Sequence, residues 1–195
     1  FRSILLGRYL ADQMSEVYSL QQHRKAFCLG NIMPDLRPSF LTTRHEFFGT
    51  FSQLQEKMRE LIERNPEEDN ARVYWRRFGE VMHYMADYFT FPHNRTYKGS
   101  LAEHNSYEAE LKNCLKECIL SGNADSQLEE AKHFDSFEEL VGYIRERHAC
   151  YLESPRCIAD DIRFILRVCY QVIQGIFQLC LRRQFHMEGR PVTAI

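Results

Sequence analysis

Hydrophobic positions recur along most of the chain with the spacing of amphipathic helices. Over residues 4–18 the apolar side chains fall three or four positions apart and form one stripe. Patterns of the same kind predict further helices over about residues 42–64, 71–91, 101–120, 137–152 and 155–186. Alternating runs bounded by hairpin turns, which are typical of paired strands, do not occur. We therefore predict an all-α fold, a single-domain bundle of about six helices spanning residues 1–195.

Prolines and capping residues predict where these helices begin and end. Pro34 and Pro38 are expected to prevent a regular helix in residues 27–40 and to hold Asp35 on an extended loop. A Ser-Pro pair at residues 154–155 predicts the start of the last helix. Ser or Thr followed three residues later by Glu predicts capping boxes at three helix starts: Thr43 with Glu46, Ser100 with Glu103, and Ser136 with Glu139.

The composition is that of an ordinary globular protein, with 44% hydrophobic and 27% charged residues. The net charge of −2, without a large basic cluster, predicts no nucleic-acid footprint. The most apolar stretch, VCYQVIQGIFQLCLRR, is interrupted by glutamines and ends in arginines, so no transmembrane segment is expected. The seven cysteines include no CxxC pair, which favours buried free thiols in a reducing cytoplasm.

Histidines and carboxylates are paired at metal-competent spacing in the middle of the chain. His83 and Asp87 stand four residues apart, and His104 and Glu108 repeat that spacing on the next predicted helix. His93 lies on the loop between the two helices. Each pair could also be an ordinary hydrogen-bonded couple on a helix face. Their repetition, with a histidine at the break between them, favours a metal site instead.

Two more donors lie upstream of these pairs, Asp35 and His45. A set of imidazoles and carboxylates without thiolates suits zinc and argues against a structural cysteine site. The full set contains too many donors for one tetrahedral ion, so two clusters are expected. Neighbouring metal ions of this kind serve phosphoester cleavage.

These residues resemble the metal-binding core of the bacterial zinc-dependent phospholipase C family. The resemblance rests on HxxxDxxxxxH at positions 83, 87 and 93, and on HxxxE at positions 104 and 108. The upstream stretch GNIMPDLRPSFLTTRHEF is similar to the family loop that carries an Asp and then a His ligand. The resemblance covers about residues 3–120, and helices over about residues 135–188 are additions to the bundle.

The resemblance implies a ligand set, a reaction and a substrate. One zinc ion is expected on Asp35, His45, His83 and Asp87, and a second on His93, His104 and Glu108, with Asp87 also reaching towards a neighbouring ion. The implied reaction is attack of a zinc-bound hydroxide on the phosphorus of a phospholipid, which releases diacylglycerol and a phosphorylated head group. Asp35 is expected to orient or deprotonate the attacking water.

The sequence departs from the family pattern at two places. The family binds a third zinc ion partly through a His at the start of the first helix, whereas Ile4 follows Ser3 here. The resemblance therefore implies two zinc ions and leaves the third in doubt. Members that prefer choline place aromatic rings where this chain has Leu36 and Thr42, so no cation-π site for choline is expected. Two alternatives stay open: a zinc-dependent single-strand nuclease or other phosphodiesterase, and a metal-binding scaffold that has lost catalysis.

Overall fold

A computed structural model of the protein describes residues 2–36, 46–64, 66, 70–155 and 157–187. These residues form ten α-helices, one 3-10 turn and no strand, which confirms the predicted all-α fold. The predicted number of about six helices was too low, because four helices of seven residues or fewer lie between the long ones. The elements are α1 (Arg2–Gln13), α2 (Tyr18–Gln22), α3 (Arg24–Gly30), α4 (Met33–Leu36), α5 (Phe47–Glu63), α6 (Ala71–Tyr88), η2 (Phe91–His93), α7 (Leu101–Leu120), α8 (Asn123–Gln127), α9 (Phe137–Glu153) and α10 (Ile158–Met187).

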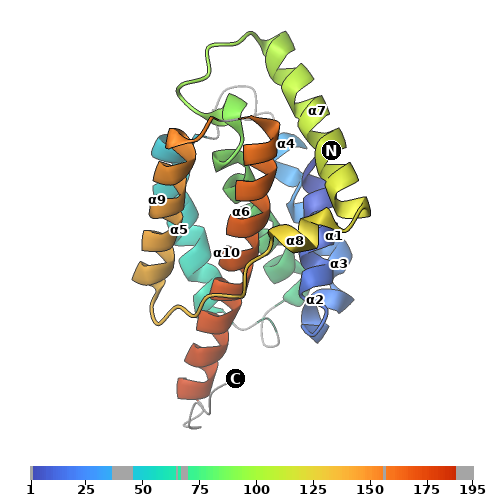
Figure 1. Ribbon diagram of the computed structural model, residues 1–195. Coiled ribbons are helices and arrows are strands. Elements are labelled where there is room, and N and C mark those ends of the chain that lie inside the picture. The colour runs from blue at the N-terminus through green and yellow to red at the C-terminus, as the bar shows by residue number, and fades with distance from the viewer. Residues whose placement is uncertain (1, 37–45, 65, 67–69, 156, 188–195) are drawn as a thin grey trace.

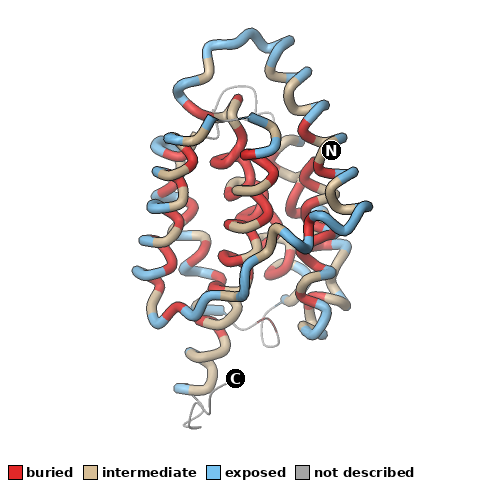
Figure 2. The backbone as a smooth tube through the Cα atoms, in the orientation of Figure 1, coloured by how far each residue is buried: buried red, intermediate tan, exposed pale blue. Residues whose placement is uncertain are grey.

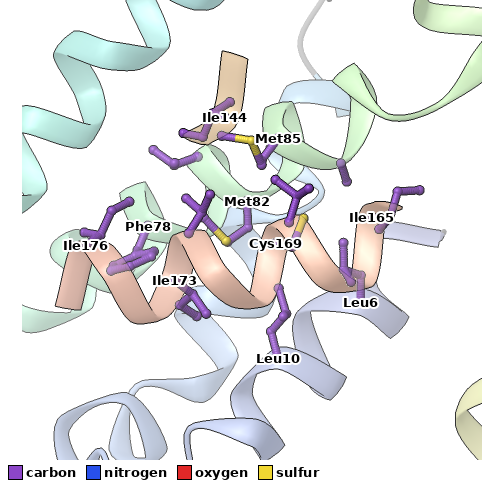
Figure 3. Packing of buried hydrophobic residues seen from close by; sticks show 14 of the residues in the cluster. Leu6, Leu10, Phe78, Met82, Met85, Ile144, Ile165, Cys169, Ile173 and Ile176 are labelled. Carbon is purple, nitrogen blue, oxygen red and sulfur yellow. The ribbon is translucent and has the colours of Figure 1, made fainter. Parts of the chain in front are cut away.

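The bundle is arranged around two long helices, α6 and α10 (Figure 1). On one side lie α5, which packs against both helices, and α9, which packs against α10; on the other side lie α1, which packs against both, and α3, which packs against α6. Buried residues line the faces of the helices that point towards one another (Figure 2). Figure 3 shows Ile165, Cys169 and Ile173 of α10 between apolar side chains of α1 and α6. This shared core fixes the relative positions of the helices that carry the candidate ligands.

Two glycines allow α3 and α6 to approach closely. A Cβ atom added at Gly30 would overlap the carbonyl oxygen of Arg76, and one added at Gly79 would overlap the carbonyl oxygen of Phe27. The obstructing atoms belong to the backbone, so no side-chain rotation could relieve the overlap. This contact brings the C-terminal end of α3, and with it Asn31, against the buried face of α6.

Three predictions made from prolines and capping residues were wrong. Asp35 lies in the one-turn helix α4 rather than on an extended loop, because a proline in a first helical turn forfeits no hydrogen bond. Helix α5 begins at Phe47 with Glu46 as its N-cap, so Glu46 cannot serve as the third residue of a capping box; Thr43 lies outside the described residues. Ser154 caps the end of α9, and α10 begins only at Ile158.

The other two predicted caps are present. Ser100 and Glu103 form the reciprocal bonds of a capping box at the start of α7. At the start of α9 the Ser136 hydroxyl accepts a hydrogen bond from the Glu139 amide, as predicted. The Glu139 carboxylate, however, accepts from the amide of Asp135 rather than from that of Ser136. Half of that second box is therefore formed.

Two expectations from composition need correction. Helix α10 is long and apolar enough to cross a membrane by length and composition, contrary to the prediction that no segment reaches this limit. Because 61% of its most apolar window is buried inside the protein, it also has the burial of a core helix. All seven cysteines are free thiols, as predicted, but only Cys169 and Cys180 are buried, and Cys157 is exposed.

Candidate metal centre

Six of the seven predicted ligands lie together at one end of the bundle core. They come from four elements: Asp35 from α4, His83 and Asp87 from α6, His93 from η2, and His104 and Glu108 from α7. The seventh, His45, lies outside the described residues. We refer to Asp35, His83 and Asp87 as the first donor group, and to His93, His104 and Glu108 as the second donor group.

His83 is the centre of the first donor group. Its Nε2 atom lies 3.4 Å from Asp35 Oδ1 and 3.1 Å from Asp87 Oδ2. Its Nδ1 atom lies 2.8 Å from the carbonyl oxygen of Asn31. A carbonyl oxygen can only accept, so Nδ1 carries a hydrogen, and Nε2 of the neutral ring points a lone pair at two carboxylates. That arrangement calls for a cation at Nε2, either a proton or a metal ion.

The second donor group is more open to solvent. His93 Nε2 lies 2.8 Å from Glu108 Oε1, and His104 Nε2 lies 3.6 Å from the same oxygen. One ligand atom from each of the three residues fits within 4.8 Å of the others. His93 Nδ1 also lies 3.7 Å from Asp87 Oδ2, which joins the two donor groups. The groups are therefore parts of one site.

Arg2 of α1 adds a permanent positive charge to this site. Its guanidinium donates to Asp87 Oδ1 over 2.6 Å and to the Thr90 hydroxyl over 2.9 Å. It also lies 3.7 Å from Glu108 Oε1. The arginine side chain is 6% exposed, so it is sealed between the carboxylates rather than directed to solvent.

The protonation of the site follows from its crowded charges. Burial opposes charging of His83, but Asp87 and Asp35 outweigh burial and raise its pKa above the ordinary value. Burial raises the pKa of Asp35. Burial also acts to raise the pKa of Glu108, yet the two histidines of the second donor group lower it overall. Without a metal ion the site therefore holds protons between its imidazoles and carboxylates.

A buried carboxylate holds the turn that carries His93. Asp161 of α10 is fully buried, and its Oδ2 atom accepts hydrogen bonds from the Phe91 amide over 3.0 Å and from the Tyr107 hydroxyl over 2.9 Å. Its Oδ1 atom accepts from the Tyr151 hydroxyl over 2.6 Å. These bonds tie η2, α7 and α9 to the start of α10. They fix the direction in which the η2 turn presents its histidine.

The donors fit zinc in kind and in spacing. Tetrahedral zinc with bonds of about 2.0 to 2.1 Å places its ligand atoms about 3.3 Å apart. The separations of 3.4 and 3.1 Å around His83 Nε2 are close to this value. The hydrogen bond from its Nδ1 atom to a carbonyl is the orienting contact that metal-ligating histidines commonly make. A zinc ion held by the three residues of the second donor group would have a coordination position available for water or substrate.

The comparison with known families agrees with this chemistry. The sequence profile of a family described as zinc dependent phospholipase C matches residues 4–158. The chain belongs to the zinc-dependent phospholipase C family. No match was found among curated proteins or among solved structures. The family likeness predicted from the histidine motifs is thus confirmed, and it extends through α9 beyond the expected limit near residue 120.

The departures from the family pattern can now be placed. Ser3 and Ile4 lie in α1 directly after Arg2, so an arginine, and no histidine, reaches the site from the start of this helix. Leu36 ends α4 with 60% of its surface exposed, and Thr42 lies outside the described residues. His23, a further histidine upstream of the donor groups, is half-buried, and its Nδ1 atom lies 2.9 Å from the Ser19 carbonyl oxygen.

Three contributors to this candidate site were missed from the sequence. Arg2 meets Asp87 across 85 positions of the chain, and no local pattern signals that contact. Asn31 contributes its backbone carbonyl, which any residue type would provide. Asp161 lies in a last helix that carries no metal motif, and acidic residues are common in a first helical turn, so no sequence signal indicated its role.

Proposed function

We propose that the protein is a zinc-dependent phosphodiester hydrolase that cleaves phospholipids on the glycerol side of the phosphate. The observation that carries this proposal is His83, whose Nδ1 atom is held by a carbonyl while Nε2 faces two carboxylates. Family membership adds support for zinc as the cation and for a phospholipid as the substrate. Two zinc ions are proposed, one on each donor group, with His45 as a further ligand of the first.

The roles of the residues follow from their exposure. Zinc supplies a water of lowered pKa and positive charge beside the phosphate oxygens. Asp35 is 27% exposed, whereas His83 and Asp87 are each 1% exposed. Asp35 is therefore the member of the first donor group that can reach both the site and solvent. We assign it the role of orienting the attacking water and accepting its proton at the carboxylate.

The head-group preference follows from the rim of the site. Leu36, next to Asp35, has no aromatic ring to offer to a quaternary ammonium group. We therefore infer that choline lipids hold no advantage over lipids with other head groups. Rates on phosphatidylcholine that exceed those on other phospholipids by tenfold or more would argue against this inference.

The test is release of phosphorylated head group from mixed phospholipid micelles by zinc-loaded protein. The wild type should release it, and chelator-treated protein and His83→Ala should not. His133→Ala is the matched control, because His133 is 63% exposed and pairs only with Asp135 in the described contacts, so activity should be retained. Single-stranded DNA and an activated chromogenic phosphodiester are assayed in parallel.

Each outcome has a distinct meaning. Cleavage of DNA without cleavage of any lipid would reassign the protein to the nuclease alternative. Full zinc loading with no cleavage of lipid, DNA or the activated ester would instead identify a metal-binding scaffold. Lipid turnover that persists without metal would contradict the proposed chemistry altogether.

A further inference from the structure

The guanidinium of Arg2 lies where three oxygen atoms converge. Nη2 is 2.6 Å from Asp87 Oδ1, and Nη1 is 2.9 Å from Thr90 Oγ1 and 3.7 Å from Glu108 Oε1. Asp87 belongs to the first donor group and Glu108 to the second, so the guanidinium bridges them. Two carboxylate oxygens and a hydroxyl form a set that a divalent cation could also use.

The guanidinium of Arg2 occupies this position permanently, because it does not lose its charge by deprotonation. An arginine side chain stays charged at every pH at which the protein is folded. With 6% of its side chain exposed, Arg2 is also not free to swing out into solvent. A metal ion could enter between Asp87 Oδ1 and Glu108 only by displacing a buried positive charge, which repels it.

We propose that Arg2 is a resident cation that takes the place of an additional metal ion and limits the site to two zinc ions. The proposal rests on zinc binding as inferred under the proposed function, but not on lipid cleavage. Arg2 is a positioning residue and not a catalytic one, because its buried guanidinium binds Asp87, Thr90 and Glu108 and not the substrate.

The charge balance supports this limit. The carboxylates of Asp35, Asp87 and Glu108 bring three negative charges, and Arg2 offsets one of them. Two zinc ions already exceed the remaining negative charge by two, and the single negative charge of a phosphodiester substrate offsets one of these. A third ion placed beside Arg2 would add two positive charges. Among the described residues, the remaining buried carboxylate near Arg2 is Asp161, and its oxygens already accept hydrogen bonds from Phe91, Tyr107 and Tyr151.

The experiment counts zinc per chain after equilibrium dialysis, by elemental analysis. Wild-type protein should saturate at about two equivalents. Arg2→Lys keeps the positive charge and should also hold about two. Arg2→Gln removes the charge while retaining an amide that can bond to Thr90, and it should take up about one equivalent more. Arg8→Gln is the matched control, because Arg8 is an exposed arginine of the same helix, and it should behave as wild type.

The results separate this proposal from the proposed function. Three equivalents in the wild type would overturn the role of Arg2, and that measurement needs no variant to fold. A count in Arg2→Gln equal to or below that of the wild type would also overturn it. Two equivalents in the wild type, a gain in Arg2→Gln and no lipid cleavage would uphold Arg2 and refute the phospholipase activity. A wild type that takes up no zinc would overturn both.

Discussion

Replacing Gly79 with alanine tests how the packing of α3 on α6 builds the metal site. A Cβ atom at this position would overlap the Phe27 carbonyl oxygen, and it would lie 2.9 Å from the Asn31 amide nitrogen and 3.0 Å from Gly30 Cα. Ordinary contacts of a Cβ atom begin at 3.4 Å. Helix α3 must therefore withdraw by at least about 0.5 Å, and by more at Phe27.

Two effects of opposite sign determine how far Gly79→Ala changes the free energy of unfolding. Alanine in place of a mid-helix glycine gains about 1 kcal/mol of helix propensity. Overpacking against a backbone that cannot rotate away costs about 1–3 kcal/mol, so we expect a net loss of about 0–2 kcal/mol in the free energy of unfolding. The withdrawal also lengthens the 2.8 Å contact between His83 Nδ1 and the Asn31 carbonyl. Loss of such an orienting bond lowers metal affinity by about 10- to 100-fold.

Urea unfolding of the metal-free protein and zinc titration against a chelator measure the two effects. Gly142→Ala is the matched control, because Gly142 also lies inside a helix but has no atom within 4 Å of the added Cβ. It should be stabilised by about 0.5–1 kcal/mol and should bind zinc as the wild type does. The reasoning is refuted if Gly79→Ala is as stable as Gly142→Ala and its zinc affinity is unchanged.

The remaining predictions concern the charges of the site. Asp87→Asn should lose more bound zinc than Glu108→Gln, because Asp87 contacts both donor groups; elemental analysis showing the reverse order would contradict this. In metal-free protein, burial lowers the pKa of His83 and His93, but nearby carboxylates raise it overall. Their stabilising contribution should be complete below the unfolded pKa of about 6.5 and should disappear as pH rises through the raised folded values, whereas the stabilisation by added zinc should grow over the same range. Thermal melts at several pH values, with and without zinc, test this prediction. The same dependence of Tm on pH in the metal-free and the zinc-loaded protein would argue against it. Both carboxylate oxygens of Asp161 accept hydrogen bonds, and Asp161→Asn replaces one of them with an amide NH₂, which cannot accept. The zinc ion of the second donor group, which includes His93, should therefore bind about 10- to 100-fold more weakly, while the zinc ion of the first donor group is unaffected. Equal loss of both ions in a chelator titration would show that the change is not confined to the turn that carries His93.

Much of the fold and of the candidate ligand set could be predicted from local sequence. Helical periodicity depends on neighbours three and four positions apart, so the long helices were located without tertiary information. The pairs His83 with Asp87 and His104 with Glu108 follow from the same spacing. Such signals depend only on the residues of a single helix, so one sequence is enough to detect them.

The rest depends on contacts between distant segments or on alternative local bonds. The ion pair of Arg2 with Asp87 and the approach of Gly30 to Gly79 exist only after the helices have packed. The start of α10 was misplaced because Ser154 caps the preceding helix instead, a competition that spacing alone does not resolve. Long-range packing thus sets the charge balance of the site, whereas local pattern sets its donors.

The central claim is that each donor group holds one zinc ion, and anomalous diffraction at the zinc edge tests it most directly. Crystals of zinc-loaded protein should show one peak against His83 Nε2, Asp35 and Asp87, and a second among His93, His104 and Glu108. The guanidinium of Arg2 should remain between Asp87 and Glu108 without a peak in its place. Absence of both peaks, or zinc bound only at sites remote from these six side chains, would contradict the account.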